Sequence, residues 1–225
     1  TIYYWEAKIM YEFLNDIHNY GVNTKTREIY INSFISSNEE DPGVDFRMAT
    51  QLIKNINYLE SLSDKPILIH MYSIGGDWGA GMAIYDAINA CTSFITMVAY
   101  SHAESMSSII LQSADFRVMT PYSYFMSHYG SSAYEGHYLN AQANAKFDKR
   151  CCDIMVDIYS KYLIKSKFFK ENYEDATQEK AKNYILRKMK NGDWYLDADE
   201  CLYFGFCDAL LGDKKAKDIV SLRNG

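Results

Sequence analysis

The stretch FITMVAYSHAESMSSIILQ, residues 94–112, places a serine where a strand is expected to end and a helix to begin. Residues 94–100 form an apolar run with the length of a buried strand, and residues 105–112 have a helical pattern. Ser105 would then lie near the positive end of a helix dipole, with its side chain and the N–H of Met106 facing the same cleft. The position also suits an ordinary N-cap serine, so the local sequence leaves both interpretations open.

Similar patterns continue on both sides of this stretch. The predicted strands are residues 27–32, 66–72, 93–100 and 123–128, and the predicted helices are residues 45–62, 78–90, 105–114 and about 138–164. Helical spacing also marks residues 5–18, and residues 37–43 have the composition of a loop. Strands that alternate with helices predict an α/β fold with a parallel sheet. With 3 prolines and no linker-like segment, residues 1–225 are expected to form a single domain.

Two further side chains and a glycine pair could complete a hydrolytic site around Ser105. His128 ends the predicted strand before Gly130, Asp193 follows a turn signal, and Gly75-Gly76 precedes them all. A hydroxyl nucleophile, an imidazole base and an orienting carboxylate make up a hydrolytic triad, and glycines let backbone N–H groups approach a developing oxyanion. Taken alone, His128 could equally be a half-buried structural histidine, and Asp193 an ordinary turn residue. The rival histidines are His18, His70, His102 and His137.

The glycine pair and the three side chains each lie in a longer sequence block. The blocks are YSIGGDWGAGMAIYD at 72–86, HAESMSS at 102–108, FMSH at 125–128 and DWYLDADECLYFGFCD at 193–208. In this order, over about residues 28–211, the blocks resemble the proteolytic subunit family of the Clp protease. The resemblance implies Ser105 as nucleophile, His128 as general base and Asp193 as the orienting carboxylate, with an oxyanion hole from the backbone N–H groups of Gly76 and Met106.

The resemblance also implies a fold and an activity. The fold would be the α/β type shared by Clp proteolytic subunits and crotonases, with repeated β-β-α units and a strand-helix handle over about residues 129–165. The activity would be that of a serine endopeptidase acting on unfolded proteins or peptides inside an oligomeric chamber, without metal or organic cofactor. Implied partners are further copies of the chain, paralogous subunits in a mixed ring, and an AAA+ unfoldase.

Two other functions stay open at this point. A crotonase-type acyl-CoA enzyme would hold a thioester oxygen with two N–H groups and could use Glu104 as an acid or base. The ordered serine, histidine and aspartate blocks have no role in that chemistry. A structural subunit of a mixed ring would commonly have lost a triad residue, whereas Ser105, His128 and Asp193 are all present.

The chain departs from the family pattern near these blocks. Tyr72 and Ile74 replace an asparagine and a proline, and Glu104 stands beside the nucleophile where a small apolar residue is usual. Gly192 takes the place of an arginine that pairs between stacked rings, so stacking is expected to be weaker. His70 replaces an aromatic residue on the strand that helps to receive an ATPase loop, so docking is expected to be altered. These differences indicate a divergent member.

Charge and composition exclude other classes of function. A net charge of −6 and a pI of about 5.4 argue against nucleic acid or an anionic membrane as the main partner. No apolar run has the length of a membrane span, and residues 1–20 lack the pattern of a signal peptide. The five cysteines, an odd number without C-x-x-C spacing, indicate reduced thiols: Cys91, Cys151, Cys152, Cys201 and Cys207. The expected location is cytoplasmic, with an organelle after removal of a presequence, or a viral origin, left open.

Overall fold

The computed structural model describes residues 14–32 and 43–225. Residues 14–20 are helical, so the helix expected over residues 5–18 is described only in its second part. The loop expected over residues 37–43 lies outside the described residues except for Gly43.

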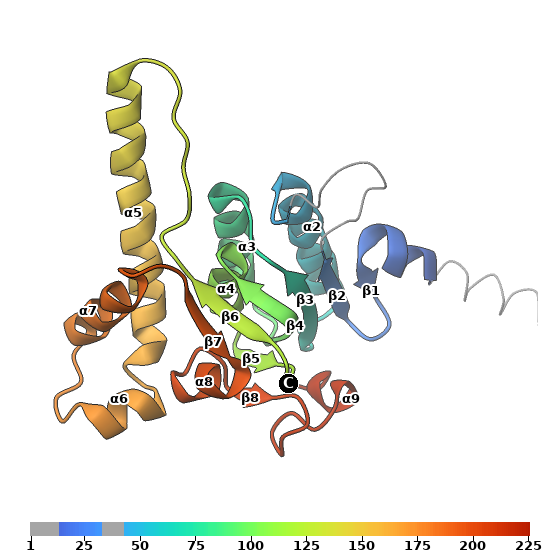
Figure 1. Cartoon of the computed structure of the whole chain (residues 1–225). Coiled ribbons are helices and arrows are strands. Elements are labelled where there is room, and N and C mark those ends of the chain that lie inside the picture. Colours follow the sequence, from blue (N-terminus) through green and yellow to red (C-terminus); the bar gives the residue numbers. More distant parts are fainter. Residues whose placement is uncertain (1–13, 33–42) are drawn as a thin grey trace, which may run out of the picture.

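A mixed sheet lies at the centre of the described structure (Figure 1). Its strands are β1 (Val22–Asn23), β2 (Glu28–Asn32), β3 (Ile67–Ser73), β4 (Ile95–Glu104), β5 (Phe116–Met119), β6 (Tyr124–Ser127), β7 (Trp194–Asp197) and β8 (Ala209–Leu210). The main order is β1-β2-β3-β4-β5-β8, in which the pairs from β2 to β8 are parallel and β1 is antiparallel to β2. This confirms the predicted α/β fold, and the four predicted strands are β2, β3, β4 and β6.

Helices and the C-terminal segment cover the two faces of this sheet. Besides the helical residues 14–20, the helices are α2 (Phe46–Leu62), α3 (Trp78–Ala90), α4 (Met106–Leu111), α5 (Tyr138–Leu163), α6 (Lys167–Asn172), α7 (Gln178–Met189), α8 (Ala198–Tyr203) and α9 (Ile219–Leu222). Successive side chains of a strand point to opposite faces, so Ile69 and Met97 join the core packed by the helices. Leu68 and Val98 instead join a smaller core with Leu222 of α9.

A bend in β4 separates the sheet into two parts. Residues 96–99 pair with β5, whereas residues 102–104 pair in parallel with β6. Ser101, between the two ladders, has a φ of 57°, a value that is uncommon for a residue with a side chain. Antiparallel pairing of β6 with β7 then extends the second part. The end of β4, the end of β6 and the start of β7 therefore meet at one edge.

The handle rises beyond the sheet as α5 and the segment that precedes it (Figure 1). The second half of α5 is packed into the core through Met155, Tyr159 and Leu163, whereas most of its first half is exposed. Residues 129–137, the first part of the predicted handle segment, contain no helix or strand. The charged segment before β7 folds into α6 and α7, and α7 is joined to α5 by a Lys182–Asp157 ion pair of 2.5 Å.

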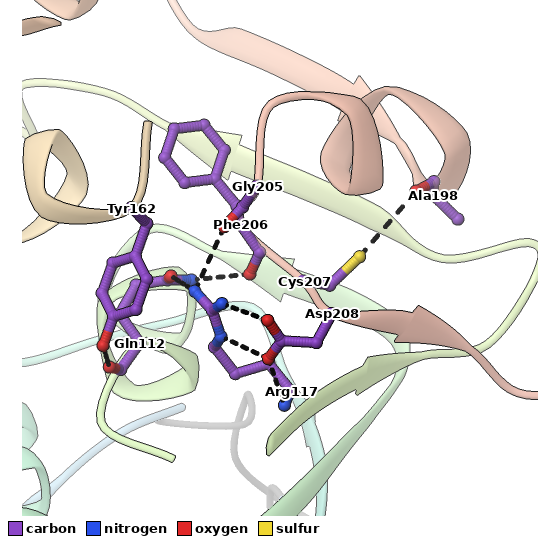
Figure 2. Close-up of polar contacts among 8 residues, drawn as sticks. All are labelled: Gln112, Arg117, Tyr162, Ala198, Gly205, Phe206, Cys207 and Asp208. Atoms are coloured by element: carbon purple, nitrogen blue, oxygen red, sulfur yellow. Dashed lines mark hydrogen bonds and ion pairs between the residues drawn. The ribbon is translucent and has the colours of Figure 1, made fainter. Parts of the chain in front are cut away.

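A buried arginine joins the helices to the C-terminal part of the sheet (Figure 2). Arg117 of β5 is 6% exposed, and its Nε and Nη2 donate to the two carboxylate oxygens of Asp208 at 2.8 and 2.5 Å. Its Nη1 donates to Gln112 Oε1 and to the carbonyl of Gly205, and its guanidinium lies 4.0 Å from the centre of the Tyr162 ring. The cluster therefore ties β5, the end of α4, α5 and the segment before β8 together.

Candidate active site

The strand register brings the three predicted triad residues to one edge of the sheet. Because β4 and β6 are parallel, Ser105 and His128 follow the ends of adjacent strands, and the Ser105 N–H donates to the Met126 carbonyl at 2.8 Å. Because β6 and β7 are antiparallel with Ser127 opposite Trp194, Asp193 lies beside His128. Ser105 and Asp193 therefore lie on either side of one imidazole, although they are 88 positions apart in sequence.

Distances between the side chains fit a serine-histidine-aspartate triad. Ser105 Oγ lies 2.8 Å from His128 Nε2, and His128 Nδ1 lies 3.3 Å from Asp193 Oδ1. If Nδ1 carries the proton and faces the carboxylate, Nε2 is free to accept the proton of the Ser105 hydroxyl. Both His128 and Asp193 stay partly exposed, with side-chain exposures of 25% and 49%, so a substrate can reach them.

The backbone of Ser105 decides between the two interpretations of this residue. Ser105 makes no side-chain capping hydrogen bond to α4, so it is not the capping serine that its position also suited. Its φ of 52° and ψ of −124° lie in a region that residues with side chains rarely adopt. Such conformations cost about 1–3 kcal/mol and concentrate at functional sites. The unusual conformation turns Oγ toward His128 instead of toward the helix.

Two backbone N–H groups beside Ser105 are available to an oxyanion. Within the described residues, neither the Gly76 N–H nor the Met106 N–H donates a hydrogen bond to the protein. The glycine turn is fixed by backbone hydrogen bonds from Val44 N to the Gly75 carbonyl and from Asp77 N to the Val44 carbonyl. Gly75 has a φ of 99°, and a Cβ there would lie 2.6 Å from Ser105 Cβ, so only glycine allows this close approach.

The remaining four histidines lie elsewhere. His102 Nδ1 pairs with Glu104 Oε1 at 2.6 Å, which engages the carboxylate that the sequence placed next to the nucleophile. His137 accepts the Leu139 N–H at the start of α5, and His18 lies in the helical segment 14–20. His128 is thus the histidine whose ring reaches Ser105.

His70 occupies an interior position that its sequence context did not reveal. It is 6% exposed, with Nε2 2.8 Å from Glu28 Oε2, Nδ1 2.9 Å from the Tyr100 hydroxyl, and its ring stacked on Tyr30 at 4.6 Å. Burial lowers the pKa of His70. Burial and the nearby Glu28 carboxylate raise the pKa of Tyr30 to about 12. The ring is therefore part of a packed polar cluster.

A cavity of about 470 Å³ opens beside Ser105 and His128. Gly76, Ser105, Met106 and His128 all line it, so it is the natural place for a substrate side chain. Its other lining residues are Asp77, Trp78, Ile109, Tyr129, Gly130, Ser131, Ser132, Phe147, Asp148, Cys151, Cys152 and Met155.

Sequence reasoning predicted the helix over about residues 138–164 but not that it forms one side of this cavity. The sequence indicated only that Cys151 and Cys152 are reduced thiols, whereas both line the cavity from α5 together with Asp148 and Met155. The spacing 148, 151, 152, 155 marks one helical face and was the signal that could have found them. Burial raises the pKa of both cysteines, so they are neutral thiols rather than reactive thiolates.

Neither a metal site nor a membrane span emerges from the described part of the chain. Within residues 14–32 and 43–225, no group of three histidine, cysteine, aspartate or glutamate side chains could hold a metal ion. No helix of those residues is long and apolar enough to cross a bilayer.

Comparison with known proteins relates the chain to one family. The sequence model of the Clp protease family matches residues 40–214. A Clp protease proteolytic subunit of Deinococcus radiodurans is 28% identical over 171 residues, covering 75% of this chain and 76% of the relative. Subunit 1 of Chlamydia pneumoniae is 32% identical over 170 residues, covering 73% and 81%. A point mutant of ClpP1 from Listeria monocytogenes shares the fold with a TM-score of 0.66 at 18% identity, covering 87% of this chain and 96% of that one.

Proposed function

Because the chain belongs to the Clp protease family, we propose that it is a serine endopeptidase that cleaves peptide bonds of unfolded proteins or peptides. The observation that carries this proposal is the 2.8 Å contact between Ser105 Oγ and His128 Nε2, with Asp193 on the far side of the imidazole. No step of this chemistry requires a metal ion or an organic cofactor.

The reaction follows from the roles of these groups. His128 takes the hydroxyl proton as Ser105 Oγ attacks the substrate carbonyl, and the imidazolium then donates that proton to the leaving amine. The acyl group stays on Ser105 until a water, activated by the same imidazole, releases the acid and restores the hydroxyl. Asp193 keeps the proton on Nδ1 and stabilises the imidazolium. The free N–H groups of Gly76 and Met106 would stabilise the oxyanion.

Assembly and partners belong to the same proposal. We expect copies of the chain, alone or with paralogous subunits, to form a ring whose inner chamber holds the active sites. An AAA+ unfoldase would supply unfolded chains to it. Five free thiols favour a reducing compartment, in agreement with the expected cytoplasmic location.

Labelling with a fluorophosphonate tests the proposal directly. The probe should modify Ser105, identified by peptide mapping, and Ser105→Ala should abolish labelling and lower peptide hydrolysis by a factor on the order of 10⁴ or more. Ser132→Ala is the matched control, since this exposed serine lines the same cavity without contacting His128. Near-normal hydrolysis by Ser105→Ala would refute the assignment. A chain that neither labels nor cleaves would instead favour an acyl-CoA enzyme or a structural ring subunit.

A further inference from the structure

The cavity beside Ser105 holds a carboxylate that the proposed reaction does not use. Asp148 lines the cavity from α5 and is half-buried. Within the described residues it forms no hydrogen bond or ion pair, whereas Asp153, five positions further along α5, is paired with Lys149 at 2.7 Å. The side chains within reach on its own helix, at positions three and four away, are Asn144, Ala145, Cys151 and Cys152, none of them basic.

Nothing else in the cavity neutralises this charge. Its lining residues include no lysine or arginine, and the other carboxylate among them, Asp77, adds a second negative charge. Asp77 already accepts the Ala80 N–H at 2.7 Å as the cap of α3, so Asp148 is the carboxylate left for a ligand. A cation that enters the cavity would therefore meet a negative charge that no basic side chain of the lining opposes, in the same cavity as the nucleophile.

The walls of the cavity suit a long side chain with a charged end. Trp78, Met106, Ile109, Phe147 and Met155 supply apolar surface between the nucleophile and the helix. The methylene stem of a lysine or arginine packs on such surface while its charged group stays at a polar end. The Trp78 ring could also attract the cation through its face.

We propose that Asp148 makes this cavity select substrates with lysine or arginine at the residue whose carbonyl is attacked by Ser105. The proposal rests on the peptidase function proposed above. The cavity is assigned to that substrate residue because it is lined by the nucleophile, the base and both oxyanion donors. A hydrogen bond to a charged group is worth enough to change kcat/KM roughly 10–100-fold.

Fluorogenic peptides that differ only at the cleaved residue test this selection. The panel holds lysine, arginine, norleucine, leucine, phenylalanine and glutamate, and norleucine is the uncharged counterpart of lysine. Wild-type protein should cleave the lysine peptide with at least tenfold higher kcat/KM than the norleucine peptide. In Asp148→Asn, the lysine and norleucine peptides should be cleaved with similar kcat/KM. In Asp148→Lys, the glutamate peptide should be cleaved with higher kcat/KM than the lysine peptide.

Asp153→Asn is the matched control, because it removes a carboxylate from the same helix outside the cavity. It should leave the lysine-to-norleucine ratio unchanged. A wild-type preference for norleucine, leucine or phenylalanine would overturn the selection, and so would a ratio that survives both Asp148 variants. If Ser105 reacts with the fluorophosphonate but either contradicting result is seen, the proposed role of Asp148 is wrong and the peptidase proposal stands. If Ser105 does not react and no peptide is cleaved, both proposals fail.

Discussion

The reactive centre depends on backbone conformations that few residues accept. Ser105 has a φ of 52° and Gly75 a φ of 99°, and the two residues approach so closely that a Cβ on Gly75 would also lie 2.9 Å from Met106 N. A side chain at position 75 would push the nucleophile and one oxyanion donor away. The glycine pair thus explains how a strained serine and its donor N–H share one turn.

The contact between Asp193 and His128 can be tested by a single-atom change. In Asp193→Asn, the amide would donate to Nδ1 and shift the imidazole proton to Nε2, which could then no longer accept the Ser105 proton. We expect kcat for a short peptide to fall by a factor on the order of 10⁴, with little change in the free energy of unfolding. Asp199→Asn on α8, exposed and away from His128, is the control. A loss smaller than tenfold would mean that Asp193 does not orient the base.

For single residues, the sequence identified the candidate side chains but not the surroundings that each side chain has in the fold. Ser105, His128 and Asp193 could be grouped because motifs mark them, and the structure brings them together. Asp148 could not be assigned to the cavity, since an aspartate on a charged helix is normally solvated. Gly192 looked like a simple loss of an arginine, but its φ of 125° is one that arginine would rarely adopt.

Among the elements, a few polar contacts hold parts of the chain that are distant in sequence. Arg117 of β5 contacts Gln112 after α4, Tyr162 of α5 and Asp208 before β8 (Figure 2). Arg117 and Asp208 are 91 positions apart, so their ion pair joins the parts of the chain that come before and after the handle. Both carboxylate oxygens of Asp208 are engaged, which is the strong, geometrically specific form of this interaction.

Loss of this pair should destabilise the fold more than loss of a surface pair. Asp208→Asn leaves a nearly buried guanidinium without its counterion, and we expect the free energy of unfolding to fall by about 3 kcal/mol. That is the low end for buried pairs, because the Asp208 side chain is 31% exposed. Urea denaturation at one fixed protein concentration measures the change. Asp153→Asn, which breaks the exposed Lys149–Asp153 pair, should cost less than about 1 kcal/mol. Equal effects of the two variants would contradict this role of Arg117.

The elements that sequence reasoning missed share a physical cause. β5 contains the buried Arg117, whose charge interrupts the apolar pattern that marks a strand. α7 is rich in charge, but it buries Ala181, Ile185 and Met189 on one face. Such elements are stabilised by partners distant in sequence, which local patterns do not contain. β3 and β4 also pair with strands distant in sequence, but they could be predicted because their long apolar runs are visible in the local sequence.

For the whole molecule, the unpartnered apolar surface gathers partly on the handle. Tyr138, Leu139 and Phe147 of α5 are 66%, 52% and 57% exposed. Phe147 lines the cavity, whereas Tyr138 and Leu139 lie at the start of the helix, where α5 projects beyond the sheet (Figure 1). Large exposed apolar side chains on a projecting element are typical of a contact with another protein. In the proposed ring assembly, further copies of the chain would cover them.

Sedimentation velocity at micromolar concentration tests this assembly. A species several times heavier than the 26.0 kDa chain is expected, because head-to-tail contacts close into rings. The double substitution Tyr138→Glu with Leu139→Glu should shift the population to smaller species, since a carboxylate in a desolvated contact is costly. Peptide cleavage should decline together with the fraction of assembled protein, because we expect the active site to be ordered in the ring. Val220→Glu, an equally exposed apolar position on α9, is the control for added charge. A wild-type monomer that cleaves peptides at full rate would show that catalysis needs no ring, and the handle would then have a different partner.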